Sequence, residues 1–175
     1  MKAILSKDIT SDSDKLSVEL EDTFLNKGDI QIIQIEKDDV LWRFVSQKNR
    51  PKYSAFWVDS ETMSSLMSVF RSWGDYSETT KKEVVRDNQA VISDWSRLSW
   101  RMKVSFIKPV IAYYGIVSPQ NLLDEKINVQ SALGGTKPLS EYRIGGFKQY
   151  VIPSLNKMSD SKGEEIASIA HFAHI

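Results

Sequence analysis

The chain has no cysteine, and its only two histidines lie in the last five of its 175 residues. The lack of cysteine excludes disulfides, thiol nucleophiles and cysteine-ligated zinc, and it leaves the redox compartment undetermined. His171 and His174 have a spacing that can chelate a metal, but no third ligand is evident near them. We therefore expect no metal, and no catalytic triad of serine, histidine and aspartate.

The chain also lacks an excess of charge and a long apolar run. It has 23 basic and 23 acidic residues, so it gives no strong nucleic-acid signal and no sign of attraction to a membrane. No apolar run approaches the ~20 residues of a membrane span. The apolar run at the N-terminus is too short for a secretory signal. No phosphate-loop or dinucleotide glycine fingerprint is present. If this domain is exported, we expect another segment to deliver it.

The length predicts a single domain over residues 1–175, large enough to fold around its own core. We divide it into a lead-in with a first strand (1–37), a core (38–153) and a tail (154–175). Residues 6–15 are expected to be flexible, and residues 16–25 fit either a helix or a strand. The remaining patterns predict strands near 30–35, 40–46, 53–58, 101–106 and 149–152, helices over 60–74 and 78–98, an apolar segment over 109–117, a loop over 118–144 and a short helix near the end. This order indicates an α+β fold with bent, mainly antiparallel sheets and two packed helices.

Arg43 stands between Trp42 and Phe44 in an otherwise apolar strand. A charged side chain in such surroundings needs a partner, which can be another side chain or a ligand. A guanidinium offers a rigid fork of donors that suits a pyrophosphate. The alternative is an edge-strand arginine that reaches solvent or pairs with an acid.

Two further places can contribute to a binding site. Ser54 lies beside Phe56 and Trp57, and aromatic faces bind flat rings, although plain core packing gives the same pattern. Gln149 follows a Gly-Gly turn at the start of an apolar strand, where it can orient a sugar hydroxyl or simply point outward. It cannot act as a general base, because an amide has no useful pKa.

These pieces occur in an order that resembles a known family. The segments are Leu-Trp-Arg-Phe-Val-Ser at 41–46, Ser-Ala-Phe-Trp-Val-Asp-Ser-Glu at 54–61, Arg-Asp-Asn-Gln-Ala-Val at 86–91, Ile-Lys-Pro-Val at 107–110, Gly-Ile-Val-Ser-Pro-Gln at 115–120 and Gly-Gly-Phe-Lys-Gln-Tyr-Val-Ile-Pro at 145–153. Together they resemble the ADP-ribosyltransferase-like and NAD-glycohydrolase domains at the C-termini of bacterial polymorphic toxins. The likeness spans about residues 38–153.

The resemblance implies an ADP-ribosyltransferase-like fold and NAD as a substrate. It assigns Arg43 and Gln149 to catalysis, and it assigns NAD binding to Arg43, Ser46, Ser54, Phe56, Trp57 and Arg86. Taken by itself, Arg86 lies off the apolar stripe of its helix and reads as a solvated residue. Members that modify arginine carry acids at the positions of Gln149 and Phe147, so hydrolysis or transfer to another acceptor fits this chain better.

The family also implies a context. Such a domain is delivered into a target cell as part of a larger polypeptide, acts in the cytoplasm on NAD and possible macromolecular acceptors, and has a cognate immunity protein. The alternative function is a non-enzymatic interaction protein, such as an immunity or phage-encoded binding protein, in which Arg43 and Gln149 are structural. Geometry separates the two, because an NAD site requires Arg43, Trp57 and Gln149 to converge on one cleft.

Overall fold

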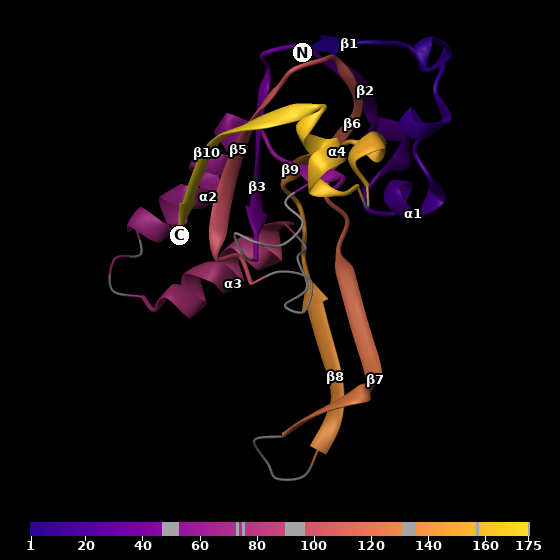
Figure 1. Ribbon diagram of the computed structural model, residues 1–175. Helices are drawn as coiled ribbons and strands as arrows, with labels where there is room; N and C mark the ends of the chain where they lie inside the picture. The colour runs from indigo at the N-terminus through magenta and orange to yellow at the C-terminus, as the bar shows by residue number, and fades with distance from the viewer. Residues whose placement is uncertain are drawn as a thin grey trace.

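The computed structural model describes residues 1–46, 53–72, 74, 76–89, 97–130, 136–156 and 158–174. Within these ranges the fold is α+β, with antiparallel sheets and two main helices (Figure 1). The expected loop at 47–52 lies outside the described residues. In the described ranges, no helix is long and apolar enough to cross a membrane.

The larger sheet has five strands, and its order brings distant parts of the sequence together. The order is β1 (Lys2–Ala3), β2 (Gln31–Ile35), β6 (Val110–Ile116), β9 (Lys148–Val151) and β4 (Phe56–Trp57). The strand expected near 53–58 therefore shortens to two residues, while those near 30–35 and 149–152 are confirmed within one residue. Strand β9 is an interior strand, since it pairs with β6 on one side and β4 on the other.

The smaller sheet has three strands in the order β10 (Ala167–His174), β5 (Trp100–Phe106) and β3 (Val40–Val45). The strand predicted near 101–106 is confirmed, and its alternate residues Met102, Val104 and Phe106 are all buried. Trp42 of β3 and Val58, just after β4, join the two sheets by a pair of backbone hydrogen bonds of 2.8 Å each.

Helices α2 (Ser60–Ser72) and α3 (Glu78–Gln89) pack against each other beside β3. Asp59 caps α2, since its carboxylate accepts from the backbone N–H of Thr62 at 2.7 Å. The predicted helix does not reach 98, because residues 97–99 are not helical, and the described part of α3 covers Glu78–Gln89. Leu98 has a left-handed backbone with φ of 49°, and its side chain is buried. It therefore packs in the core without being part of a helix. Residues 90–96 lie outside the described ranges.

Residues before β2 cover one face of the larger sheet. They form three short 3-10 turns (Ser6–Asp8, Asp12–Asp14 and Lys27–Asp29) and helix α1 (Val18–Glu21), which settles the ambiguity at 16–25 toward a helix. Leu20 and Phe24 pack there against Tyr113 and Val151. The main core fills the opposite face, between the two sheets, and includes Trp57. Ile9 and Leu16 pack against the same cluster, so the expected lead-in contacts this face of the sheet.

Two predictions for the second half of the chain are wrong. The expected loop over 118–144 contains β7 (Gln120–Gln130) and β8 (Thr136–Arg143), a two-stranded hairpin that extends away from the body (Figure 1). A ribbon outside the core does not need the apolar alternation that marks a half-buried strand, so the pattern missed it. The expected terminal helix is instead strand β10, which follows a 3-10 turn (Pro153–Leu155) and helix α4 (Asp160–Glu164).

Candidate functional site

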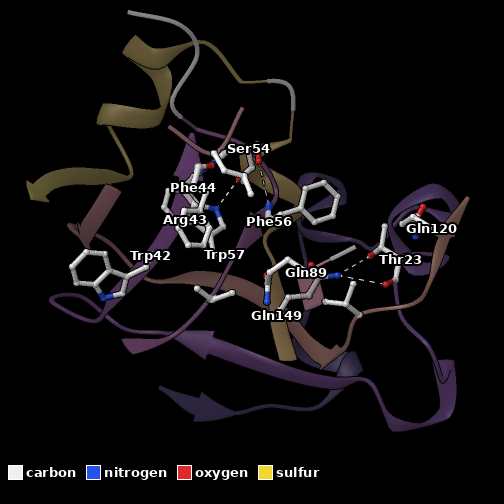
Figure 2. Close-up of a pocket in the computed structure, with 13 residues that line it drawn as sticks. Thr23, Trp42, Arg43, Phe44, Ser54, Phe56, Trp57, Gln89, Gln120 and Gln149 are labelled. Atoms are coloured by element: carbon white, nitrogen blue, oxygen red, sulfur yellow. Dashed lines mark hydrogen bonds between the residues drawn. The ribbon is translucent and has the colours of Figure 1, made fainter. Parts of the chain in front are cut away.

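A pocket of about 450 Å³ opens where β3, β4, β9 and the end of α3 meet (Figure 2). Its size is ordinary for a small-molecule site, and its wall is mostly apolar with a few polar groups. The residues that line it are Thr23, Trp42, Arg43, Phe44, Ser54, Phe56, Trp57, Val58, Gln89, Leu98, Val117, Gln120 and Gln149.

Five of the seven residues assigned from the sequence line this one pocket: Arg43, Ser54, Phe56, Trp57 and Gln149. The backbone explains why they meet. The bridge between Trp42 and Val58 places β3 beside β4, and β4 pairs with β9 so that Trp57 lies opposite Tyr150, the neighbour of Gln149. The convergence that an NAD cleft requires is therefore present in the structure.

Arg43 is held in the pocket with an incomplete set of partners. Its Nε donates to the carbonyl oxygen of Phe44 at 3.4 Å, and its guanidinium carbon lies 5.5 Å from the ring centroid of Trp57. Among the described residues, nothing accepts a hydrogen bond from its buried Nη1. Burial lowers the pKa of Arg43 to about 10, although the carboxylate of Asp160 opposes this shift. Arg43 is therefore still charged at neutral pH, and it presents a donor that a bound anion can use.

The two neighbouring aromatic residues differ in what they offer. Trp57 is only 1% exposed, and its indole N–H already donates to the carbonyl oxygen of Ser54 at 2.7 Å. Phe56 is 40% exposed, so its ring is free to meet a ligand. Trp57 therefore contacts the guanidinium of Arg43 from within the core, while Phe56 is the ring that can stack on a flat group of a ligand.

Gln149 is 5% exposed, and its amide is tied to the segment after α1. Its Nε2 donates to Thr23, with distances of 3.3 Å to the hydroxyl Oγ1 and 3.5 Å to the backbone oxygen (Figure 2). Gln89, at the end of α3, also faces the pocket, and within the described residues its buried Nε2 has no hydrogen-bond partner. Unpaired buried donors are costly, so Gln89 and Arg43 both mark places where a ligand acceptor would fit.

The turn before β9 is fastened to the end of α3. The N–H groups of Gly145 and Phe147 donate to the carbonyl oxygens of Asp87 and Asn88 at 2.7 and 3.2 Å. These carbonyls belong to the last described turn of α3, so the helix supplies the acceptors that hold the turn. Gly145 has φ of 73°, and a Cβ there would lie 2.5 Å from the carbonyl oxygen of Val117. A glycine is thus needed where the turn positions Gln149 relative to Gln89.

We expect Gly145→Ala to lower the free energy of unfolding by at least about 1–3 kcal/mol, because the left-handed backbone and the contact with Val117 both become strained. Gly74→Ala is the matched control, since a Cβ at Gly74 meets nothing within 4 Å. Urea denaturation of both variants checks the difference. Equal stabilities for the two variants would contradict this account of the turn.

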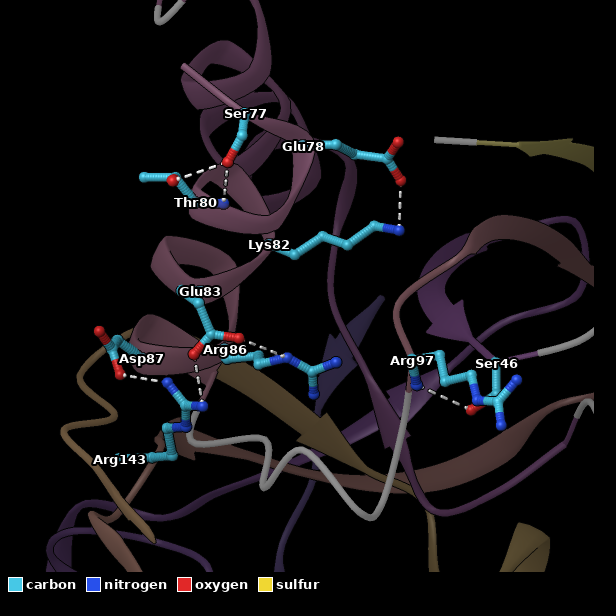
Figure 3. Close-up of polar contacts among 10 residues, drawn as sticks. All are labelled: Ser46, Ser77, Glu78, Thr80, Lys82, Glu83, Arg86, Asp87, Arg97 and Arg143. Carbon is cyan, nitrogen blue, oxygen red and sulfur yellow. Dashed lines mark hydrogen bonds and ion pairs between the residues drawn. The ribbon is translucent and has the colours of Figure 1, made fainter. Parts of the chain in front are cut away.

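Ser46 and Arg86, to which the resemblance assigns NAD binding, do not line the pocket. The hydroxyl of Ser46 accepts from the backbone N–H of Arg97 at 3.1 Å (Figure 3). Arg86 is 6% exposed, so reading it as a solvated residue is wrong, and its Nε lies 3.2 Å from a carboxylate oxygen of Glu83. Glu83 also pairs with Arg143 of β8 at 2.6 Å, which places Arg86 in the contact between helix and hairpin.

The pocket includes residues that the sequence did not point to, above all Thr23 and Gln89. Gln89 lies three positions after Arg86 in the helix segment that carries the resemblance, and it is Gln89, not Arg86, that lines the pocket. Thr23 precedes the segment of resemblance and carries no signal of its own. Among the described residues, no group of three or more His, Asp or Glu side chains is placed to hold a metal ion.

Comparison with known proteins adds little to this geometry. No family model matches the chain, and no curated protein matches it. A chain from the solved complex of Rhs1-CT with its cognate immunity protein RhsI1 aligns with 14% identity and a TM-score of 0.46, over 83% of this chain and 81% of that chain. A likeness of this extent carries no weight for function, so the residues of the pocket must carry the proposal.

Proposed function

We propose that this chain is an NAD-consuming toxin or effector domain with an ADP-ribosyltransferase-like fold, which cleaves the bond between nicotinamide and ribose. The observation that carries the proposal is the meeting of Arg43, Phe56 and Gln149 in one pocket. Each residue alone could have a purely structural role. Together, a buried guanidinium with an unpaired donor and an exposed ring beside it suit a ligand that is anionic and partly aromatic. NAD has both features.

In this proposal each residue has a separate task. Nη1 of Arg43 binds the pyrophosphate, and Trp57 holds the guanidinium in place. Phe56 stacks on the nicotinamide ring, and Ser54 lines the wall beside it. The Nε2 of Gln89 donates to an acceptor of the ligand, which removes the cost of leaving that donor unpaired.

The reaction needs charge stabilisation at the ribose. When the C–N bond breaks, its electron pair leaves with nicotinamide, and positive charge develops on the anomeric carbon and ring oxygen, as in glycoside cleavage. An amide oxygen of Gln149 near the ribose orients a hydroxyl and stabilises that charge. Water, or the nucleophile of a macromolecular acceptor, then bonds to the anomeric carbon and releases one proton. Gln149 cannot remove that proton from an acceptor, which favours hydrolysis or an acceptor that ionises readily.

The test is incubation with NAD while free nicotinamide is measured. We expect release of nicotinamide by the wild-type chain, and a several-fold rise in KM for Phe56→Ala, which removes the exposed stacking ring. Ile107→Ala is the control, because Ile107 is 45% exposed and does not line the pocket. Release without any added protein or nucleic acid selects hydrolysis, and release only with an acceptor selects transfer. No release under either condition overturns the proposal.

The biological setting proposed here follows the same resemblance. The domain would be carried into a target cell by a larger polypeptide, act in the cytoplasm, and be neutralised in the producing cell by a cognate immunity protein. Co-purification of such a partner encoded beside the toxin, with loss of NAD cleavage on binding, tests this setting.

A further inference from the structure

We propose that Thr23 is a positioning residue that fixes the orientation of the Gln149 amide, so that only its carbonyl oxygen faces a ligand. Thr23 belongs to the segment before β2, outside the part of the chain that resembles the toxin family. The catalytic consequence of this inference rests on the proposed function, but the orientation itself does not.

The two atoms of Thr23 that face Gln149 both act as hydrogen-bond acceptors. The backbone oxygen can only accept, and it also accepts from the N–H of Ser118 at 2.8 Å. The hydroxyl Oγ1 uses its single proton to donate to the carbonyl oxygen of Leu20 at 2.6 Å, so toward Gln149 it offers a lone pair. The amide nitrogen can donate to both acceptors, whereas the amide oxygen would face the lone pairs of two acceptors and would be repelled by them.

The direction of the amide oxygen, Oε1, follows from the position of the nitrogen. Nε2 is engaged by Thr23, and within the described residues Oε1 makes no hydrogen bond to the protein. Since Gln149 lines the pocket, this oxygen is the part of the amide that remains for a ligand. The ligand group that meets Gln149 must then be a hydrogen-bond donor, such as a sugar hydroxyl, and not a phosphate or carboxylate oxygen.

The backbone around Thr23 is built to hold this contact. Phe24 forms a bridge with Val117, and the N–H of Leu25 donates to the carbonyl oxygen of Ile116 at 2.9 Å. The ring of Phe24 lies over Gly115, where an added Cβ would come within 2.7 Å of it. Gly115 is the residue of β6 that lies opposite Gln149 in β9. The missing side chain at 115 thus lets the segment of Thr23 approach the strand that carries Gln149.

The test uses Thr23→Val, which keeps the shape of the side chain but removes Oγ1, and Thr23→Ser, which keeps the hydroxyl. The first readout is solvent exchange of the Gln149 side-chain NH₂ in ¹⁵N-labelled protein, assigned by the signal lost in Gln149→Met. We expect exchange to be about fivefold faster in Thr23→Val, as the loss of one ordinary hydrogen bond implies, and to be restored in Thr23→Ser. Unchanged exchange in Thr23→Val overturns the proposal, whatever the chain does with NAD.

The second readout is steady-state cleavage of NAD. A misoriented Gln149 should lower kcat with KM nearly unchanged, and Thr23→Ser should restore kcat, because the loss is of transition-state stabilisation and not of binding. A rise in KM at constant kcat would contradict the positioning role. Altered exchange together with no cleavage by the wild-type chain would support the orientation of Gln149 and overturn the proposed function, so the two failures are distinguishable.

Discussion

Arg43→Met should strongly reduce the proposed NAD cleavage and at the same time make the free protein more stable. The variant removes the donor proposed for the pyrophosphate, so we expect kcat/KM to fall by about a hundredfold or more. It also removes a buried charge whose Nη1 has no partner among the described residues. Leaving such a group unsatisfied costs about 1–3 kcal/mol, which exceeds the ~1 kcal/mol lost with the contact to Trp57.

The pKa of Arg43 sets the pH range of this effect. Because burial holds its pKa at about 10 in the folded chain, below its usual value, the charge is a cost to folding at every pH below about 10. Denaturation at pH 7 therefore reports the full gain in stability. Arg101→Met is the matched control, since Arg101 has a buried Nε without a partner in the described ranges but does not line the pocket. It should keep NAD cleavage, and loss of activity in both variants would point to a general defect.

Gln149→Ala should lower kcat by about 10²–10³-fold with little change in the fold, because it removes the group that we propose to stabilise developing charge at the ribose. Gln149→Glu should not rescue activity, although it restores the acid found in transferases. The carboxylate would be almost fully buried against the two acceptors of Thr23, so burial and lone-pair repulsion should raise its pKa.

A raised pKa makes the stability of Gln149→Glu depend on pH with a definite sign. The folded chain then holds a proton that the unfolded chain releases above about pH 4.3, so stability falls as the pH rises from that value to the folded pKa. Thermal unfolding at pH 4.5 and pH 8, compared with the wild-type chain, measures this difference. A Gln149→Glu variant that cleaves NAD normally and unfolds alike at both pH values would contradict the site described here.

The sequence predicted the site better where the site lies within strands. Arg43 and Gln149 stood out because a polar residue inside an apolar strand breaks a regular pattern, and both line the pocket. Only the resemblance pointed to Ser46 and Arg86, and their side chains contact other parts of the protein outside the pocket. Thr23 could not be found, because its role depends on two acceptors and on a register across β6 that no local pattern encodes.

The fold shows the same division. Strands β3 and β5 were predicted well because one face of each is packed on the core and the apolar alternation records it. Hairpin β7–β8 and strand β10 were missed, since the first lies outside the body and the second buries only its first residue, Ala167, so its sequence shows little apolar alternation.

The contact between Thr23 and Gln149 joins residues 126 positions apart, and the hydroxyl of Tyr53 reaches the carbonyl oxygen of Ala167 across 114 positions. Contacts of such separation form late and slowly, because a long loop must close before they contribute. The pocket is therefore absent while the chain is unravelled, because Thr23 and Gln149 both line it and must first come together. An extended chain would accordingly lack the proposed activity, which could appear only after the segment of Thr23 has docked on the strand of Gln149.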